Sequence, residues 1–343
     1  MINLKYIICP NCFSSLKINK KIDNDNYILN CRCNLYPLTS GIIYMKNDKV
    51  KNKLINKISH NKNFLHLFSF SLISNFLFRL KLFKNLLFSL NFAFFLRIIT
   101  FLGYDKKYAF YISQRKNLPS FFLFLLSLSI IDKKNSLILD LGCGIGQLLK
   151  YYIYKTRPNN IIGIDKDFFS LYIARKYFTK KNILLICCDL EKNIPLKPNS
   201  IDYFFMTDGF HNINNKKKFI KKLIEISKTK ILKGAIIQML SKKANTYKEY
   251  YTENQKNIKK IIKSTNQSNF FIVSSSYLWK NLKNNNLIKL INDYKKRVYN
   301  IFFTNKEYVF LEKPFLLLLR KTKVNFYQDN DLIMDLKYND DKN

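Results

Sequence analysis

Apolar residues gather in short runs along the central part of the chain, and most of these runs end at an acidic or small residue. The runs are Leu137–Asp140, Ile161–Asp165, Ile183–Cys188, Asp202–Met206 and Leu232–Met239. Continuous apolar runs of this length are typical of strands that are buried on both faces. Segments of helical periodicity, such as Lys216–Lys230, lie between them. This alternation predicts a parallel sheet with ligands at the carboxyl ends of its strands.

The stretch Phe64–Phe101 is crowded with Phe and Leu, and its polar residues recur at helical spacing. These polar residues are Ser71, Ser74, Asn75, Arg79, Lys81, Asn85 and Ser89, which leave a wide apolar face. The cations interrupt what would otherwise be a membrane span of about 20 apolar residues. We therefore predict one or two amphipathic helices, which cover a substrate pocket as a lid, dock on a membrane surface or pack structurally. A further apolar helix is predicted at Phe121–Ile131.

Three of the eight glycines fall within five residues directly after the first apolar run, at Gly142, Gly144 and Gly146. Glycine permits backbone angles closed to other residues and lets a ligand lie against the main chain. The spacing is G-x-G-x-G, not the G-x-G-x-x-G whose loop holds a pyrophosphate. Asp140 would repel a pyrophosphate but can face the ammonium group of an amino acid. The stretch predicts a strand, a cofactor loop and a helix.

Acidic residues follow the next apolar runs. Asp165 lies nineteen residues after Gly146, close to the spacing of about 20 at which a carboxylate reaches ribose hydroxyls. Asp189 follows the third run, where an acceptor can meet an adenine amino group. The loop after the fourth run contains Asp208 and His211.

With these residues in this order, residues 136–242 resemble the class I S-adenosylmethionine-dependent methyltransferases, and among them the group of ubiquinone and menaquinone methylases. The resemblance implies an α/β, Rossmann-like sheet of seven mostly parallel strands with helices on both faces. Val298–Phe303 and Phe315–Arg320 are the candidates for its last strands. The alternative is a Rossmann-like domain that binds another ligand.

The resemblance also implies S-adenosylmethionine as the cofactor. It places Asp140 and Gly142 near the methionine part, in the loop that Gly144 and Gly146 complete. It places Asp165 near the ribose, and Asp189 with Leu190 near the adenine.

Members of this family often carry an acid and one or two histidines in the fourth-strand loop, and the match falls on Asp208, His211 and Asn212. Asn212 stands where the more regular histidine of the family would be. With an ordinary pKa near 6.5, His211 is a candidate general base. In the alternative, His211 only shapes the cofactor pocket, because methyl transfer from a sulfonium needs little beyond positioning. His60 and His66 receive no role.

Four of the seven cysteines form two pairs, Cys9-Pro-Asn-Cys12 and Cys31-Arg-Cys33. Two thiolate pairs on neighbouring hairpins can complete a tetrahedral Zn²⁺ shell; the alternative is a ribbon with free thiols. Lys5–Met45 resembles the small zinc-ribbon domain that activates tRNA and protein methyltransferases. The second pair is one residue shorter than the usual C-x-x-C. The other three cysteines are predicted to be packing residues.

The net charge of the chain indicates which classes of binding partner to consider. The 59 basic and 23 acidic residues give a formal charge of +36, which suggests RNA or an anionic membrane surface. Abundant Lys, Asn, Ile, Phe and Tyr also fit an AT-biased genome, which gives the charge a simpler source. Reduced cysteines without a secretion signal predict a cytoplasmic protein.

We predict a zinc-ribbon-like module over 1–48, a helical lid or linker over 49–131 and a methyltransferase domain over 132–325. The domain includes a lid insertion over 242–297, and a polar tail covers 326–343. The predicted function is S-adenosylmethionine-dependent methyl transfer to a small, partly apolar organic molecule. An RNA base methyltransferase is the first alternative, and a non-catalytic binding subunit is the second.

Overall fold

The computed structural model describes residues 4–60, 62–115, 133–179, 182–229 and 233–238, a few positions between 121 and 131, and short strands farther along. These residues form two compact units. Unit 1 comprises residues 1–113, 142–153 and 157–200, and unit 2 comprises 114–141, 154–156 and 201–343. Each unit is described by itself.

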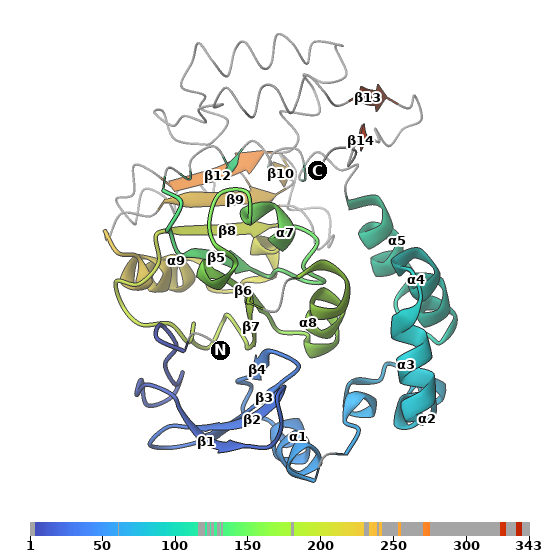
Figure 1. The fold of residues 1–343 in the computed structure, drawn as a ribbon. Coiled ribbons are helices and arrows are strands. Elements are labelled where there is room, and N and C mark those ends of the chain that lie inside the picture. The colour runs from blue at the N-terminus through green and yellow to red at the C-terminus, as the bar shows by residue number, and fades with distance from the viewer. Residues whose placement is uncertain are drawn as a thin grey trace. The chain divides into compact units, whose positions relative to one another are not determined.

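Unit 1 contains six neighbouring strands in the order β1-β2-β3-β4-β7-β6 (Figure 1). Their bounds are Lys17–Lys21 (β1), Asn26–Asn30 (β2), Leu35–Thr39 (β3), Ile42–Tyr44 (β4), Leu184–Cys187 (β7) and Ile161–Asp165 (β6). The first four are antiparallel, whereas β4 pairs with β7, and β7 with β6, in parallel. The N-terminal hairpins therefore continue the parallel strands instead of standing apart from them. Every residue of β4 is buried, as is typical of a strand that is covered on both faces.

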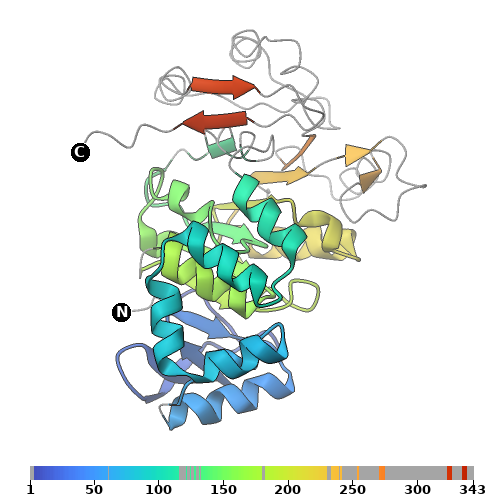
Figure 2. The same ribbon diagram turned by 90° about the vertical axis from the view of Figure 1, so that its right-hand side faces the viewer.

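The helices of unit 1 are short. They are Lys49–Ser59 (α1), Leu65–Phe68 (η1), Leu72–Arg79 (α2), Lys81–Ser89 (α3), Phe92–Phe101 (α4), Lys106–Gln114 (α5), Leu149–Tyr152 (α7), Pro158–Asn160 (η4), Phe168–Ile173 (α8) and the π-helical Ala174–Phe178 (η5). The Asp48 side chain caps α1 by accepting a hydrogen bond from the Lys51 backbone. Helix α1 then packs against β3 (Figure 2), which buries Leu54 and Ile58.

The prediction of one or two helices over Phe64–Phe101 was wrong, because this stretch folds into one 3₁₀ turn and three α-helices. The reason is local capping chemistry. Ser71 and Ser74 form a capping box that starts α2, and the Asn91 side chain caps α4. Between α2 and α3, Leu80 adopts an extended conformation that breaks the helical run.

The sequence sets the polar residues of α2 apart from a wide apolar face, but the polar side is not the exposed one. Ser74 is fully buried, and its Oγ accepts hydrogen bonds from the Phe70 and Ser71 backbones. The Asn75 amide donates to the His66 carbonyl and to Ser69 Oγ. These bonds satisfy the inward polar groups, while Leu72, Ile73 and Phe76 are exposed to solvent.

Aromatic side chains fasten the short helices to α8 and η5. Phe68 stacks on Phe168 at a ring distance of 4.1 Å, and Phe70 meets Phe169 edge-on at 5.4 Å. Phe95 contacts Tyr177 at 5.0 Å. Pairs of this kind add to the free energy gained from burial alone. The Phe-rich stretch thus forms much of the core of unit 1.

Arg175 connects the N-terminal hairpins to this core. Its guanidinium donates to the Gly41 carbonyl at 2.9 Å and to the Ile183 carbonyl. Burial lowers the pKa of Arg175 to about 10, so the side chain stays charged at neutral pH.

We expect Arg175→Met, which keeps the aliphatic stem, to lower the free energy of unfolding by about 2 kcal/mol, because two carbonyls lose a charged donor. Urea unfolding measures this free energy. The control variant Lys20→Met, at an exposed position of β1, should alter the free energy of unfolding by less than about 0.5 kcal/mol.

Unit 2 contains four parallel strands in the order β5-β8-β9-β12. Their bounds are Ile138–Leu141 (β5), Tyr203–Thr207 (β8), Gly234–Gln238 (β9) and Phe270–Ser274 (β12). Phe210–Asn212 forms a 3₁₀ turn (η6), and α9, Lys216–Ile226, buries Phe219, Ile220 and Leu223. The two-stranded pairs are Leu240–Ser241 (β10) with Glu253–Asn254 (β11), and Lys323–Phe326 (β13) with Met334–Lys337 (β14).

Each of the five apolar runs of the central region contains a strand, and the basic segment predicted at Lys216–Lys230 contains α9, so these predictions are confirmed. The proposed last strands Val298–Phe303 and Phe315–Arg320 lie outside the described residues. The same holds for nearly all of the 242–297 insertion and for most of Phe121–Ile131. In the part of the chain that the structure describes, no helix is both long enough and apolar enough to cross a membrane.

Candidate functional site

The glycine loop begins where β5 ends. Gly142, Gly144 and Gly146 all have positive φ angles, between +54° and +74°, which non-glycine residues adopt only at a cost. Gly146 also packs tightly within unit 1, because a Cβ atom there would lie 2.7 Å from the Ala174 Cβ. The loop therefore needs glycine for its conformation and for its close packing against η5.

We expect Gly146→Ala to lower the free energy of unfolding by about 2–3 kcal/mol, through backbone strain and the clash with Ala174. Gly209→Ala is the matched control, because Gly209 has a φ of −120° and its new methyl group would meet the flexible Met206 side chain. The control should cost less than about 1 kcal/mol. Equal costs for the two variants in denaturant unfolding would contradict the packing argument.

Asp165 is held against the glycine loop within unit 1. It ends β6, and its Oδ2 accepts a hydrogen bond from the Gly144 backbone at 2.8 Å. Its Oδ1 accepts from the Asp167 backbone at 2.9 Å. A carboxylate has about four acceptor positions, so Asp165 keeps capacity for ligand hydroxyls. Burial raises the pKa of Asp165, and the charge of Asp167 adds to this, while the two backbone hydrogen bonds oppose it.

Asp189 lies at the end of the neighbouring strand. The β6–β7 register pairs Asp165 with Cys187, and the Cys188 backbone donates to the Asp165 carbonyl at 3.0 Å. Asp189 follows immediately, with its Oδ1 accepting from the Glu191 backbone, and Leu190 is buried. Within unit 1, Asp165 and Asp189 thus lie at the carboxyl ends of the adjacent strands β6 and β7, and the Gly144 amide contacts Asp165.

Asp140, Asp208 and His211 belong to unit 2. Asp140 is buried on β5 and pairs with Phe205 of β8. Asp208 follows β8 with a φ of +56°, and its backbone donates to the Ile237 carbonyl. A positive φ in a non-glycine residue is uncommon and often occurs at functional loops. His211 lies on η6 and is half-buried, and its role as a base remains a prediction.

Two side chains near this part of unit 1 were not predicted. Tyr104 lies between α4 and α5, and its burial and the charge of Tyr108, then those of Asp167 and Asp165, raise its pKa. Gln147 follows the glycine loop, and its amide donates to the Ile112 carbonyl of α5 at 3.0 Å. No sequence motif marks either residue, because both contacts depend on how the α4–α5 segment packs.

The four N-terminal cysteines form a second candidate site. Their sulfur atoms all lie within 4.8 Å of one another, with Cys9 Sγ 3.5 Å and Cys31 Sγ 3.7 Å from Cys33 Sγ. Four sulfurs at about 2.3 Å from a tetrahedral Zn²⁺ are about 3.8 Å apart, so the spacing fits this ion. None of the seven cysteines forms a disulfide.

Backbone amides and one tyrosine support the sulfurs. The Asn11 amide donates to Cys9 Sγ at 3.3 Å, and the Asn34 amide donates to Cys31 Sγ at 3.2 Å. Tyr36 Oη lies 3.1 Å from Cys9 Sγ in the buried interior. The short Cys31-Arg-Cys33 spacing therefore still forms a turn in which a backbone amide faces a sulfur. Such outer contacts orient metal ligands.

A comparison with models of known protein families finds a match over the central strands. The model of the family described as "Methyltransferase domain" matches residues 139–230. Residues 139–230 are therefore similar to a methyltransferase domain. The match covers the glycine loop, Asp165, Asp189, Asp208 and His211, and it supports an enzyme that uses S-adenosylmethionine.

Among curated proteins, the chain is 30% identical over 123 residues to "Putative methyltransferase 235L" of Invertebrate iridescent virus 6, which covers 32% of this chain. The chain spans 45% of the length of that relative. An S-adenosylmethionine-dependent methyltransferase from Aquifex aeolicus has a TM-score of 0.35 at 23% identity, over 44% of this chain and 81% of that one. A complex of the Haloferax volcanii Trm112 methyltransferase activator with a methyltransferase has a TM-score of 0.38 at 13% identity, over 44% of this chain and 69% of that chain.

Proposed function

We propose that this chain transfers a methyl group from S-adenosylmethionine to a small, partly apolar organic acceptor. The observation that carries the proposal is the Asp165 carboxylate, which is fixed by the Gly144 amide inside the matched methyltransferase domain. In this proposal Asp165 accepts hydrogen bonds from the ribose hydroxyls, and Asp189 with Leu190 holds the adenine. Gly142, Gly144 and Gly146 leave room for the methionine part, and Asp140 faces its ammonium group.

When bound, S-adenosylmethionine supplies a methyl group on a sulfonium sulfur. The residues of the chain then need only to bind and orient the two reactants, because orientation alone can supply a large part of the rate. His211, with Asp208 beside it in sequence, is the candidate for removing a proton from an acceptor hydroxyl or amine. The mainly apolar composition of 64–101 supports an acceptor with an apolar part.

Transfer of labelled methyl from S-adenosylmethionine into a host-cell lysate tests the proposal. The lysate is separated afterwards into RNA, protein and organic-soluble fractions. We expect label in the organic-soluble fraction with the wild-type chain and none with Asp140→Ala, which removes the proposed ammonium partner. Label in RNA would favour a base methyltransferase, and label in no fraction would contradict the enzymatic proposal.

We further propose that Cys9, Cys12, Cys31 and Cys33 hold a structural Zn²⁺. The sulfur spacing, the absence of a disulfide at these four residues and the amides that face the sulfurs support it. With four protein ligands the ion has no open position, which is typical of structural sites. The zinc would therefore stabilise the hairpins and take no part in the reaction.

A further inference from the structure

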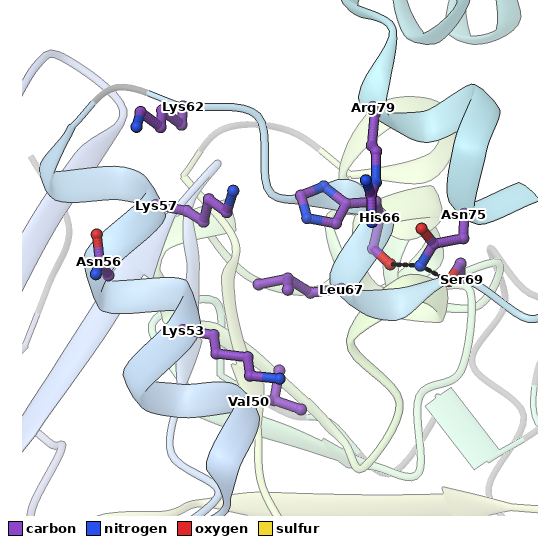
Figure 3. Close-up of a pocket in the computed structure, with 10 residues that line it drawn as sticks. All are labelled: Val50, Lys53, Asn56, Lys57, Lys62, His66, Leu67, Ser69, Asn75 and Arg79. Carbon is purple, nitrogen blue, oxygen red and sulfur yellow. Dashed lines mark hydrogen bonds between the residues drawn. The ribbon is translucent and has the colours of Figure 1, made fainter.

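A pocket of about 550 Å³ lies in unit 1 among α1, η1 and α2 (Figure 3). Its lining residues are Val50, Lys53, Asn56, Lys57, Lys62, His66, Leu67, Ser69, Asn75 and Arg79. Four of these side chains are cationic and none is acidic. Lys57 lies in the last turn of α1 and Arg79 in the last turn of α2, so part of their charge offsets the helix dipoles.

The cations converge on His66. In Figure 3 the side chains of Lys57 and Arg79 extend toward its ring. Burial lowers the pKa of His66, and the charges of Lys57 and Arg79 lower it further. The His66 Nδ1 atom is buried and has no hydrogen-bond partner among the described residues. A pocket with several cations and no carboxylate in its lining is suited to a phosphate group.

The segment around this pocket has a higher net positive charge than the average composition of the chain would give, because it lacks acidic residues. Residues 49–104 contain nine Lys and Arg and no Asp or Glu, whereas the whole chain has 23 acidic residues in 343. At that average, a stretch of this length would hold about four acids. An AT-biased genome affects the whole chain alike, so it does not explain why this one segment has no acidic residues.

The same segment exposes large apolar side chains. They are Leu72, Ile73 and Phe76 on α2, Leu82 and Leu86 on α3, and Phe94 and Phe101 on α4. Leu72 is 90% exposed, Leu82 82% and Phe101 89%. Single exposed apolar residues are ordinary, but seven on three consecutive helices indicate a binding surface. Helix α2 contributes both to this surface and, through Asn75 and Arg79, to the cationic pocket.

We propose that α2–α4 dock on an anionic lipid bilayer, with a lipid phosphate in the pocket beside His66 and the exposed apolar side chains in the interfacial region. Short amphipathic helices with Lys or Arg and exposed Leu and Phe bind bilayers in this way. The proposed occupant is a lipid surface because an anionic bilayer supplies negative charge and apolar contact side by side. The residues that carry this proposal, Lys57, His66 and Arg79, are not among those of the proposed methyl-transfer site, and the proposal does not depend on that site.

Sedimentation of the full chain with vesicles tests this proposal. We expect binding to vesicles that contain phosphatidylglycerol and little binding to phosphatidylcholine alone. Each cation near an anionic surface contributes about fivefold to the partition coefficient, so Lys57→Gln with Arg79→Gln should weaken binding by at least about tenfold. Leu72→Ser with Phe76→Ser should also weaken it by at least about tenfold, because both side chains leave the interface.

Strand β1 offers matched controls at exposed positions. Lys17→Gln with Lys20→Gln removes the same charge, and Ile18→Ser removes an apolar side chain that is 54% exposed. Both should leave binding within about twofold. Unchanged melting temperatures show that each variant is folded, as expected for exposed side chains.

Three outcomes would overturn the proposal. The first is an absence of binding to anionic vesicles, and the second is an equal loss of binding in the β1 charge variant, which would indicate a nonspecific charge effect. The third is binding of single-stranded RNA, or of soluble glycerol phosphate, that depends on Lys57 and Arg79 while vesicles do not bind.

Discussion

Replacing Asp165 with Ala should weaken the binding of S-adenosylhomocysteine by about 100-fold or more. A hydrogen bond to a charged group contributes about 1.5–3 kcal/mol, and the proposed carboxylate would lose its bonds to the ribose. The variant also removes the acceptor of the Gly144 amide, which fixes the loop. Isothermal titration calorimetry measures the affinity directly and does not require a known acceptor.

Asp165→Asn separates the two contributions, because its amide oxygen can still accept from Gly144 but the side chain is neutral. We expect its affinity to lie between those of the wild type and Asp165→Ala. Glu225→Gln, at an exposed position of α9, removes one negative charge elsewhere and should leave the affinity unchanged. Wild-type affinity in Asp165→Ala would remove Asp165 from the site.

The affinity should also fall as the pH is lowered. The ionised carboxylate is the form that accepts hydrogen bonds from hydroxyls, and protonation removes it. Because burial raises the pKa of Asp165, this loss should begin at a higher pH than an ordinary aspartate would show. The Asp165→Asn variant should lack this pH dependence.

Removal of the zinc proposed at the four cysteines should destabilise the N-terminal hairpins by at least about 3 kcal/mol. Zinc binding to such sites contributes folding energy directly, and small zinc modules unfold without the ion. We expect about one zinc per chain in the purified protein, with loss of the zinc and a lower melting temperature in Cys9→Ser. Elemental analysis and thermal unfolding provide the two readouts.

Cys187→Ala is the matched control for the zinc site. Cys187 is fully buried on β7 and lies outside the cluster, so the variant should lose some stability through a small cavity but keep its zinc. Zinc-free wild-type protein whose melting temperature is unaffected by a chelator would contradict the metal proposal, whatever the variants show.

The sequence by itself determined the central strands and the glycine loop. Apolar runs such as Ile161–Asp165 are buried on both faces, and positive φ angles at Gly142, Gly144 and Gly146 require glycine, so both are encoded locally. The spacing from Gly146 to Asp165 predicted a ribose ligand, which stays a prediction, and the structure places the Asp165 carboxylate against the Gly144 amide. The cysteine spacing likewise brought four sulfurs together.

Only the tertiary structure decided the arrangement of the segment before the domain. Helical periodicity placed Ser74 on one side of the helix, apart from an apolar face. The fold then buried Ser74, which belongs to the capping box of α2, together with Phe78, and left Leu72 exposed. Likewise, β4 lies beside β7, and Arg175 reaches Gly41 across 134 residues. Such contacts join segments far apart in sequence, and the free energy that selects them comes from burial and pairing that no local pattern contains.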